Sequence, residues 1–252
     1  MKKCSESLTH TLLSFTLLCG ALCALLTIGS IHLSSAQAIP ADSGLGLDAG
    51  DILSSVTIVI DAGHGGEDGG AQSEDGVYEK TLNLEIAEIL NTMLRANGIA
   101  TVMTRTEDVL LYDRNADFQG RKKMLDLTTR RRIAEETENP VFVSIHMNSF
   151  PESRYSGLQV FYSPNDPLSE CLAAEIRQYT RQYIQPNNHR EIKAANSSIY
   201  LLDRLQCPAV LVECGFLSNP EESILLANPD YQQKVAFVLF CSIMSYISEQ
   251  NA

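Results

Sequence analysis

The sequence lacks the short motifs that mark nucleotide sites and thiolate metal sites. Its densest glycine stretch, residues 63–70, has neither the G-x-x-x-x-G-K-S/T pattern of a P-loop nor the G-x-G-x-x-G spacing of a dinucleotide site. None of the seven cysteines forms a C-x-x-C pair, which argues against a zinc knuckle. Internal repeats and low-complexity tracts are also absent. The length of 252 residues suits one globular domain with an appendage.

Basic residues are scarce throughout the chain. There are 19 Lys and Arg against 31 Asp and Glu. Without residues 1–38, which hold two lysines and one glutamate, 17 basic and 30 acidic residues remain, a net charge of −13. Because nucleic-acid binding depends on neutralising phosphates, this balance argues against a nucleic-acid partner. An acidic surface favours solubility and does not identify a substrate.

The longest apolar run lies at the N-terminus. Two lysines precede residues 11–31, which are almost uncharged and rich in Leu, Ala, Cys and Ile, and an Ala-Gln-Ala motif ends at Ala38. This order predicts an export signal over residues 1–38. An uncleaved anchor is the alternative, because about 20 apolar residues can span a bilayer, and the membrane would then be contacted only through this segment. Residues 39–55 are interpreted as a linker, so we expect the working domain, residues 56–252, outside the cytoplasm.

Four cysteines, Cys171, Cys207, Cys214 and Cys241, lie beyond the N-terminal segment. An even number in an exported domain permits disulfides, but the spacings show no disulfide framework. Cys214 follows a predicted strand and Cys241 lies in an apolar helix, so we interpret both as buried thiols.

Residues 56–252 alternate between β-branched runs and amphipathic segments. Val and Ile favour strands, whereas apolar residues recur with a helical period between Leu82 and Met93. The predicted strands are 56–60, 99–103, 141–145, 159–162 and 209–212, and the predicted helices are 79–95, 121–138, 168–183, 220–227 and 231–248, of which 121–138 is expected to be solvated. Alternating strands and helices predict an α/β layered sheet.

Ionisable residues follow three of these strands. Asp61 and His64 follow the first strand, His146 the third and Glu213 the fifth. Since parallel strands end at one edge of a sheet, we expect these side chains to converge. Asp61 is either an orienter of an imidazole or a turn residue that bonds its own backbone.

Glu79 is predicted to face the core, because it stands three and seven residues before Leu82 and Ile86 on the apolar stripe of its helix. A carboxylate in that position must be paired, neutralised or metal-bound, although the helix dipole alone also favours a Glu in the first turn. With His64 and His146 it makes a His₂Glu set, the ligand combination typical of catalytic zinc. Either histidine alone would be interpreted as a structural residue.

Glu213 is a candidate general base for such a site. It ends the buried run 209–212, where desolvation would raise its pKa. A carboxylate of that kind could take a proton from the attacking water and return it to a leaving amine. The alternative is a structural carboxylate bonded to an arginine or to backbone N–H groups.

Four segments resemble the signatures of the zinc-dependent N-acetylmuramoyl-L-alanine amidases, the amidase-3 family. They are residues 58–66 (IVIDAGHGG), 78–84 (YEKTLNL), 143–149 (VSIHMNS) and 211–220 (LVECGFLSNP). The resemblance runs from about Val56 to the C-terminus. One departure is Ala134-Glu135, which stands where the family's arginine helix often ends in Ala-Asn; neither residue is a proposed ligand.

The resemblance implies an open, mostly parallel twisted sheet with helices on both faces. It implies one Zn²⁺ per chain held by His64, Glu79 and His146, with Glu213 as the catalytic carboxylate. The implied reaction is hydrolysis of the amide bond between N-acetylmuramic acid and L-alanine in peptidoglycan, in the cell wall. A catalytic domain behind an export signal, with no wall-binding repeats, is similar to the sporulation amidases that help to form muramic δ-lactam in spore cortex. Whether a protein activator assists is left open.

Three rival interpretations use the same residues differently. A zinc carboxypeptidase-like peptidase would share the ligands but needs an arginine clamp for a terminal carboxylate, which spacing does not locate. A thiol hydrolase would pair Cys214 with His146, although nothing marks Cys214 as a thiolate. A non-catalytic wall-binding protein would have no need of intact His64, Glu79, His146 and Glu213.

Overall fold

The computed structural model describes residues 56–113 and 120–250. The predicted signal or anchor segment (1–38) and linker (39–55) lie outside the described residues. Across the described ranges, no helix combines the length and apolar character needed to cross a membrane.

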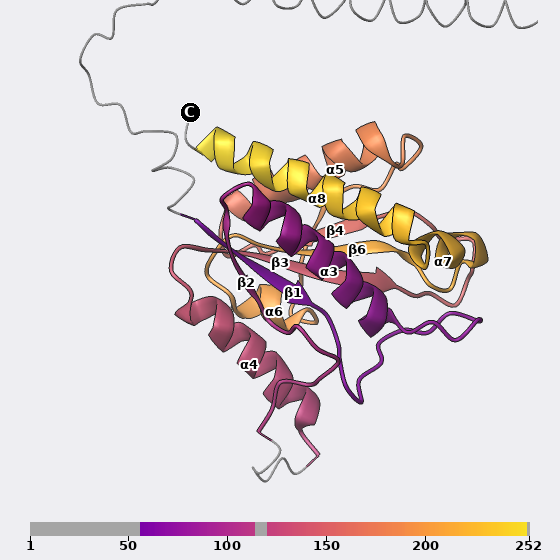
Figure 1. Cartoon of the computed structure of the whole chain (residues 1–252), viewed down its shortest axis with the longest axis horizontal. Helices are drawn as coiled ribbons and strands as arrows, with labels where there is room; N and C mark the ends of the chain where they lie inside the picture. Colours follow the sequence, from indigo (N-terminus) through magenta and orange to yellow (C-terminus); the bar gives the residue numbers. More distant parts are fainter. Residues whose placement is uncertain (1–55, 114–119, 251–252) are drawn as a thin grey trace, which may run out of the picture. The chain divides into compact units, whose positions relative to one another are not determined.

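Six strands of the described chain form one sheet in the order β2-β1-β3-β6-β4-β5 (Figure 1). Their bounds are β1 Thr57–Ala62, β2 Ala100–Met103, β3 Pro140–Asn148, β4 Gln159–Tyr162, β5 Lys193–Ala194 and β6 Ala209–Phe216. Strands β2, β1, β3 and β6 run parallel, β4 is antiparallel to β6, and β5 is parallel to β4. The predicted mostly parallel α/β sheet is therefore confirmed.

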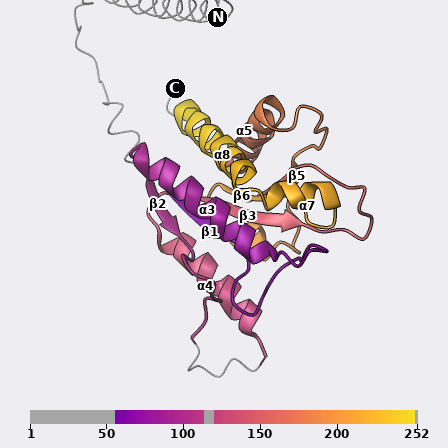
Figure 2. The same cartoon turned by 45° about the vertical axis from the view of Figure 1, so that its right-hand side comes forward.

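Helices cover both faces of this sheet (Figures 1 and 2). Their bounds are α3 Glu79–Ala96, α4 Lys122–Glu136, α5 Leu168–Tyr183, α6 Tyr200–Arg204, α7 Pro220–Leu226 and α8 Pro229–Gln250. Ile58 and Ile60 of β1 pack in the core shared with α3, α5 and α8, whereas Val59 packs in a second cluster with Ala134 of α4 and Leu202 of α6. Successive strand residues thus fill two opposite cores, as a sheet buried on both faces requires.

The sheet extends further towards its carboxyl edge than the sequence predicts. Strand β3 continues to Asn148 and β6 to Phe216, so His146 and Glu213 lie inside strands and are register partners. The ladder continues past these polar side chains because its hydrogen bonds are made by the backbone. The pairing becomes irregular only between His146 and Asn148.

The four cysteines of the described residues are all free. Cys214 is fully buried, as predicted, and burial raises the pKa of its thiol. Cys241 is half-buried and Cys171 is exposed, so the interpretation of Cys241 as a buried thiol is only partly right. Full burial and a raised pKa are the opposite of what a nucleophilic thiolate requires, so the thiol-hydrolase alternative finds no support.

Candidate metal centre

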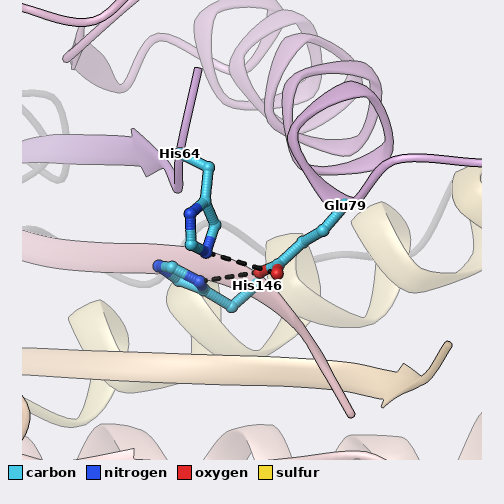
Figure 3. A group of neighbouring side chains, drawn as sticks. All are labelled: His64, Glu79 and His146. Carbon is cyan, nitrogen blue, oxygen red and sulfur yellow. Dashed lines mark hydrogen bonds and ion pairs between the residues drawn. The ribbon is translucent and has the colours of Figure 1, made fainter. Parts of the chain in front are cut away.

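The structure brings together the three predicted ligands from separate elements (Figure 3). His64 lies in the turn after β1, Glu79 begins α3, and His146 projects from β3. Their donor atoms all lie within 4.8 Å of one another, with His64 Nε2 3.2 Å from Glu79 Oε2 and His146 Nδ1 2.9 Å from Glu79 Oε1. Ligands bound at about 2.0–2.1 Å around a tetrahedral zinc ion stand about 3.4 Å apart, so the donor set fits that metal.

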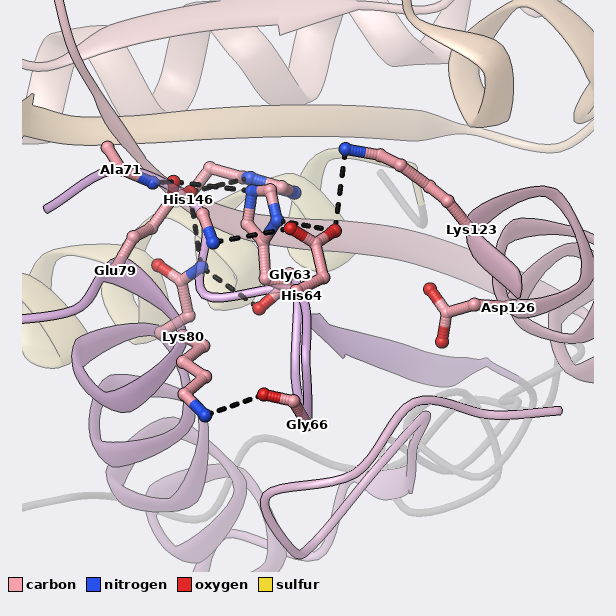
Figure 4. A network of polar contacts seen from close by, with 12 residues as sticks. Gly63, His64, Gly66, Ala71, Glu79, Lys80, Lys123, Asp126 and His146 are labelled. Carbon is pink, nitrogen blue, oxygen red and sulfur yellow. Dashed lines mark hydrogen bonds and ion pairs between the residues drawn. The ribbon is translucent and has the colours of Figure 1, made fainter. Parts of the chain in front are cut away.

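Backbone and amide donors fix the Glu79 carboxylate. The N–H of Ala71 donates to Oε2 at 2.8 Å (Figure 4). The N–H of Met147 donates to Oε1 at 3.0 Å. The Asn83 amide adds a longer contact of 3.3 Å to Oε1. Burial opposes the charged form, but the two imidazoles hold the pKa of Glu79 well below its usual range. Glu79 is therefore an ionised, oriented carboxylate that could serve as a ligand, and not merely a first-turn residue of its helix.

Asp68 is the carboxylate beside the second nitrogen of His64. Its Oδ2 lies 2.9 Å from His64 Nδ1, close in distance although the ring N–H is not aligned for a hydrogen bond. Burial disfavours the charged imidazole, yet Asp68 and Glu79 together raise the pKa of His64 to about 9. A metal ion needs the neutral imidazole, so binding would displace this proton. The only signal for Asp68 in the sequence is its position four residues after His64 in the glycine turn.

The partners that the structure describes for Asp61 are neither an imidazole nor its own following backbone, so neither interpretation offered for it, orienter or turn residue, is supported. Its Oδ1 accepts hydrogen bonds from Thr104 Oγ1 and Arg130 Nη1, both at 2.7 Å, and its Oδ2 accepts one from Ser144 Oγ at 2.6 Å. Burial would raise the pKa of Asp61, but Arg130 and Ser144 lower it overall. Asp61 is a buried ion-pair partner beneath the site, because both of its oxygens are already occupied.

Helix α4 is solvated only in part, because Asp126, Arg130 and Ala134 on one side of it are buried. The side chain of Arg130 is 2% exposed and also bonds Asp126 Oδ2 at 2.8 Å. Its Nη1 and Nη2 donate to the carbonyls of Ala62 and His64, each at 2.7 Å. Helix α4 therefore contacts the backbone of a proposed ligand through a buried arginine that sequence reasoning missed.

A second buried arginine supports the same turn. Arg105 Nε donates to the Ala62 carbonyl at 2.8 Å, and its Nη2 donates to the Gly63 carbonyl at 3.0 Å. Asn83 also donates to Gly63 at 3.1 Å. The carbonyls of residues 62–64 therefore all have partners, which allows His64 to adopt a φ of 61°, a region uncommon for non-glycine residues.

Two glycines leave room for the three candidate ligands. A Cβ on Gly63 would lie 2.3 Å from the His146 ring. A Cβ on Gly70, whose φ is +67°, would lie 2.4 Å from Glu79 Oε2 and 2.8 Å from the His64 ring. The glycine turn is thus required by the close approach of imidazole and carboxylate groups to the backbone.

Glu213 lies opposite His146 in the ladder between β3 and β6. Its Oε2 is buried and has no hydrogen-bond partner in the described part of the chain. Desolvation raises the pKa of Glu213 to about 7, with Glu79 adding to the rise and His146 opposing it. No arginine or backbone donor satisfies this oxygen, so the structural alternative finds no support there.

An α/β sheet with imidazole and carboxylate donors gathered at its carboxyl edge, beside an unpartnered carboxylate, is typical of metal-dependent hydrolases. The chain belongs to the N-acetylmuramoyl-L-alanine amidase family (Amidase_3), whose model matches residues 58–243.

Individual relatives agree with this assignment. The germination-specific N-acetylmuramoyl-L-alanine amidase of Bacillus subtilis is 36% identical over 199 residues, covering 79% of this chain and 83% of the relative. The CwlD amidase from Clostridioides difficile, solved in complex with the GerS lipoprotein, is 37% identical with a TM-score of 0.72, covering 77% of this chain and 98% of that one. The catalytic domain of CwlV from Paenibacillus polymyxa is 31% identical with a TM-score of 0.63, covering 76% and 98%. These matches give no support to the carboxypeptidase-like alternative.

Proposed function

We propose that this protein hydrolyses the amide bond between N-acetylmuramic acid and L-alanine of peptidoglycan, using one zinc ion held by His64, Glu79 and His146. The observation that carries the proposal is the convergence of these three donors with a buried, unpartnered Glu213 oxygen in a chain of the amidase family. Two imidazoles and one carboxylate suit a catalytic zinc site because they leave a coordination position for water.

Glu213 is the proton carrier in this proposal. When bound, zinc supplies Lewis-acid polarisation of the scissile carbonyl and lowers the pKa of water to about 7. With a pKa of about 7, Glu213 can accept a proton from the attacking water and then donate it to the leaving nitrogen of L-alanine. Glu79 stays ionised throughout, since three donors and two imidazoles stabilise its charge.

The cellular setting is part of the proposal. Residues 1–38 would direct export of the chain or anchor it in the membrane. Residues 39–55 would connect this segment to the catalytic domain, residues 56–252, which would act on the cell wall. Two similar proteins, a germination-specific amidase and an amidase solved with a lipoprotein, support a role in spore cortex and a lipoprotein partner. The net negative charge supports the absence of a nucleic-acid partner.

Digestion of purified peptidoglycan tests the reaction. The protein should release peptides with a free L-alanine amino terminus and leave lactyl carboxylates on the glycan, both detectable by mass spectrometry. Elemental analysis should find about one zinc per chain. New termini inside the stem peptide, with none at L-alanine, would favour a peptidase, and binding without new termini would favour a wall-binding protein.

A further inference from the structure

A cavity of about 710 Å³ lies next to the carboxyl end of β6. It is lined by the loop 154–157, the segment 184–190 and residues of α7, the helix that follows β6. Arg190 joins this cavity to the catalytic strand, because its Cζ lies 4.6 Å from the ring centroid of Phe216, the last residue of β6. Glu213 precedes Phe216 by three residues, which corresponds to about 10 Å along a strand.

Arg190 is held in place from several sides. Its backbone N–H donates to Asn188 Oδ1 at 2.9 Å, and its carbonyl accepts from Arg177 Nε at 3.1 Å. Its Nε donates to the Ser156 carbonyl at 2.7 Å, and its guanidinium lies over Phe216. None of these contacts uses the two terminal nitrogens, and no residue that the structure describes bonds to them. The Arg190 guanidinium is therefore fixed in its orientation, and its two terminal nitrogens remain available to a ligand.

The two carboxylates that line the cavity, Glu221 and Glu222, do not pair directly with the terminal nitrogens of Arg190. Glu222 Oε1 accepts from the Gly157 N–H and its Oε2 from the Phe216 N–H, both at 2.7 Å, so each oxygen is already bonded. Glu221 is exposed in the first turn of α7. Neither forms an ion pair with Arg190 among the described residues. Burial raises the pKa of Glu222 and Arg190 opposes this rise electrostatically, but the two terminal nitrogens of Arg190 have no direct carboxylate partner there.

We propose that this cavity binds the stem peptide of the substrate, with Arg190 taking a peptide carboxylate through its terminal nitrogens. The proposal rests on the amidase function above. A guanidinium fork matches a carboxylate in two parallel hydrogen bonds. Stem peptides carry a free α-carboxylate on the γ-linked D-glutamate that follows L-alanine, and those containing diaminopimelate carry a second on the third residue. An extended peptide advances about 3.3–3.6 Å per residue, so these groups lie about 7–11 Å from the scissile amide, comparable with the spacing from Glu213 to Phe216.

Calorimetric titration of the purified protein with free peptides tests this subsite without requiring turnover. Three peptides, each amidated at its C-terminal α-carboxyl, distinguish the source of the carboxylate: L-Ala-γ-D-Glu-meso-diaminopimelate, the same peptide amidated also at the glutamate α-carboxyl, and the peptide with L-lysine third. The variants are Arg190→Gln and Arg190→Lys, with Arg95→Gln at the exposed end of α3 as the charge-matched control.

We expect Arg190→Gln to weaken binding of the fully acidic peptide about tenfold, as loss of a charge-assisted pair would, and Arg190→Lys to weaken it less. The peptide that lacks the recognised carboxylate should bind the wild-type protein about tenfold more weakly than the fully acidic peptide does. Its affinity for Arg190→Gln should equal its affinity for wild type, because the lost interaction is the same one. Arg95→Gln should match wild type.

The proposal is overturned if wild type binds all three peptides equally or none of them, or if Arg190→Gln retains full affinity. The ligand series in wild type keeps this test valid even if Arg190→Gln unfolds. Failure of the proposed hydrolysis is distinguishable, because it would appear as Arg190-dependent peptide binding without release of peptides from the wall.

Discussion

Replacing Arg130 by methionine should destabilise the protein more than any exposed arginine substitution. Methionine keeps much of the side-chain volume but removes the charge between Asp61 and Asp126, which are 1% and 3% exposed. Breaking a buried ion pair costs about 3–5 kcal/mol, because an uncompensated charge stays in the core. The Ala62 carbonyl keeps Arg105 as a donor, but the His64 carbonyl loses its bond from Arg130, which adds about 1 kcal/mol.

A loss of about 4–6 kcal/mol is a large part of the 5–15 kcal/mol that stabilises a typical domain. Urea unfolding followed by circular dichroism measures it. Arg131→Met is the matched control, since Arg131 is a neighbour on α4 with only a 3.6 Å contact to the half-exposed Glu135, and it should cost less than about 1 kcal/mol. Zinc affinity should also fall in Arg130→Met, by about 10–100-fold, because the backbone of His64 is released.

The pH dependence follows from Asp61. Its pKa is lowered in the folded protein, so its contribution is present above the unfolded-state value of about 3.9 and is lost as pH falls through the folded-state value. In Arg130→Met, burial of Asp61 should raise its pKa instead. The difference in unfolding free energy between wild type and Arg130→Met should therefore shrink towards acidic pH. The double variant Arg130→Met/Asp61→Asn should recover part of the loss at neutral pH. An Arg130→Met protein within about 1 kcal/mol of wild type would refute this reasoning.

Three further predictions concern the metal site. Glu213→Gln should keep zinc, measured by elemental analysis, but lower peptidoglycan hydrolysis by about 10²-fold or more, and full activity would remove Glu213 from the mechanism. Gly70→Ala should lose zinc because its Cβ would lie 2.4 Å from Glu79 Oε2. The control is Gly98→Ala, where φ is similarly positive at +80° and a Cβ would have nothing within 4 Å, so the variant should keep zinc and lose only about 1 kcal/mol of unfolding free energy in urea. Equal zinc occupancy in the two variants would contradict this prediction. Chelation should abolish activity yet leave a cooperative unfolding transition by circular dichroism, and a chelated protein that is already unfolded would show that the metal forms the site.

Three of the four proposed site residues could be placed from the sequence because each is tied to an apolar strand run or to the period of a helix. His146 and Glu213 follow apolar runs that suit only buried strands, and parallel topology brings the ends of such strands together. Glu79 could be placed because the apolar stripe of its helix is long and regular. Each of these patterns lies within a single helix or strand, so it can be recognised without knowledge of tertiary contacts.

The supporting residues could not be predicted for the opposite reason. Arg105 and Arg130 are charged side chains in polar stretches, where exposure is the ordinary expectation. Their acceptors are backbone carbonyls and a carboxylate distant in the sequence, 69 residues away in the case of Arg130 and Asp61. The periodic spacing of apolar residues gives no information about pairs of polar groups that lie this far apart in the sequence. Strand β5 and helix α6 were missed because two and five residues are too short to show a period.

The two arginines also explain why the site should exist before a metal binds. A turn with His64 at a φ of 61° and three consecutive carbonyls outside the usual ladder would be costly unless those carbonyls were bonded. Arg105, Arg130 and Asn83 satisfy all three, and backbone N–H groups hold Glu79 independently. In small zinc domains the ion supplies the folding energy, but here buried side chains of the protein fix the donors. Two protons remain to be moved: metal binding would displace the one on His64, and the proposed hydrolysis would transfer the one on Glu213.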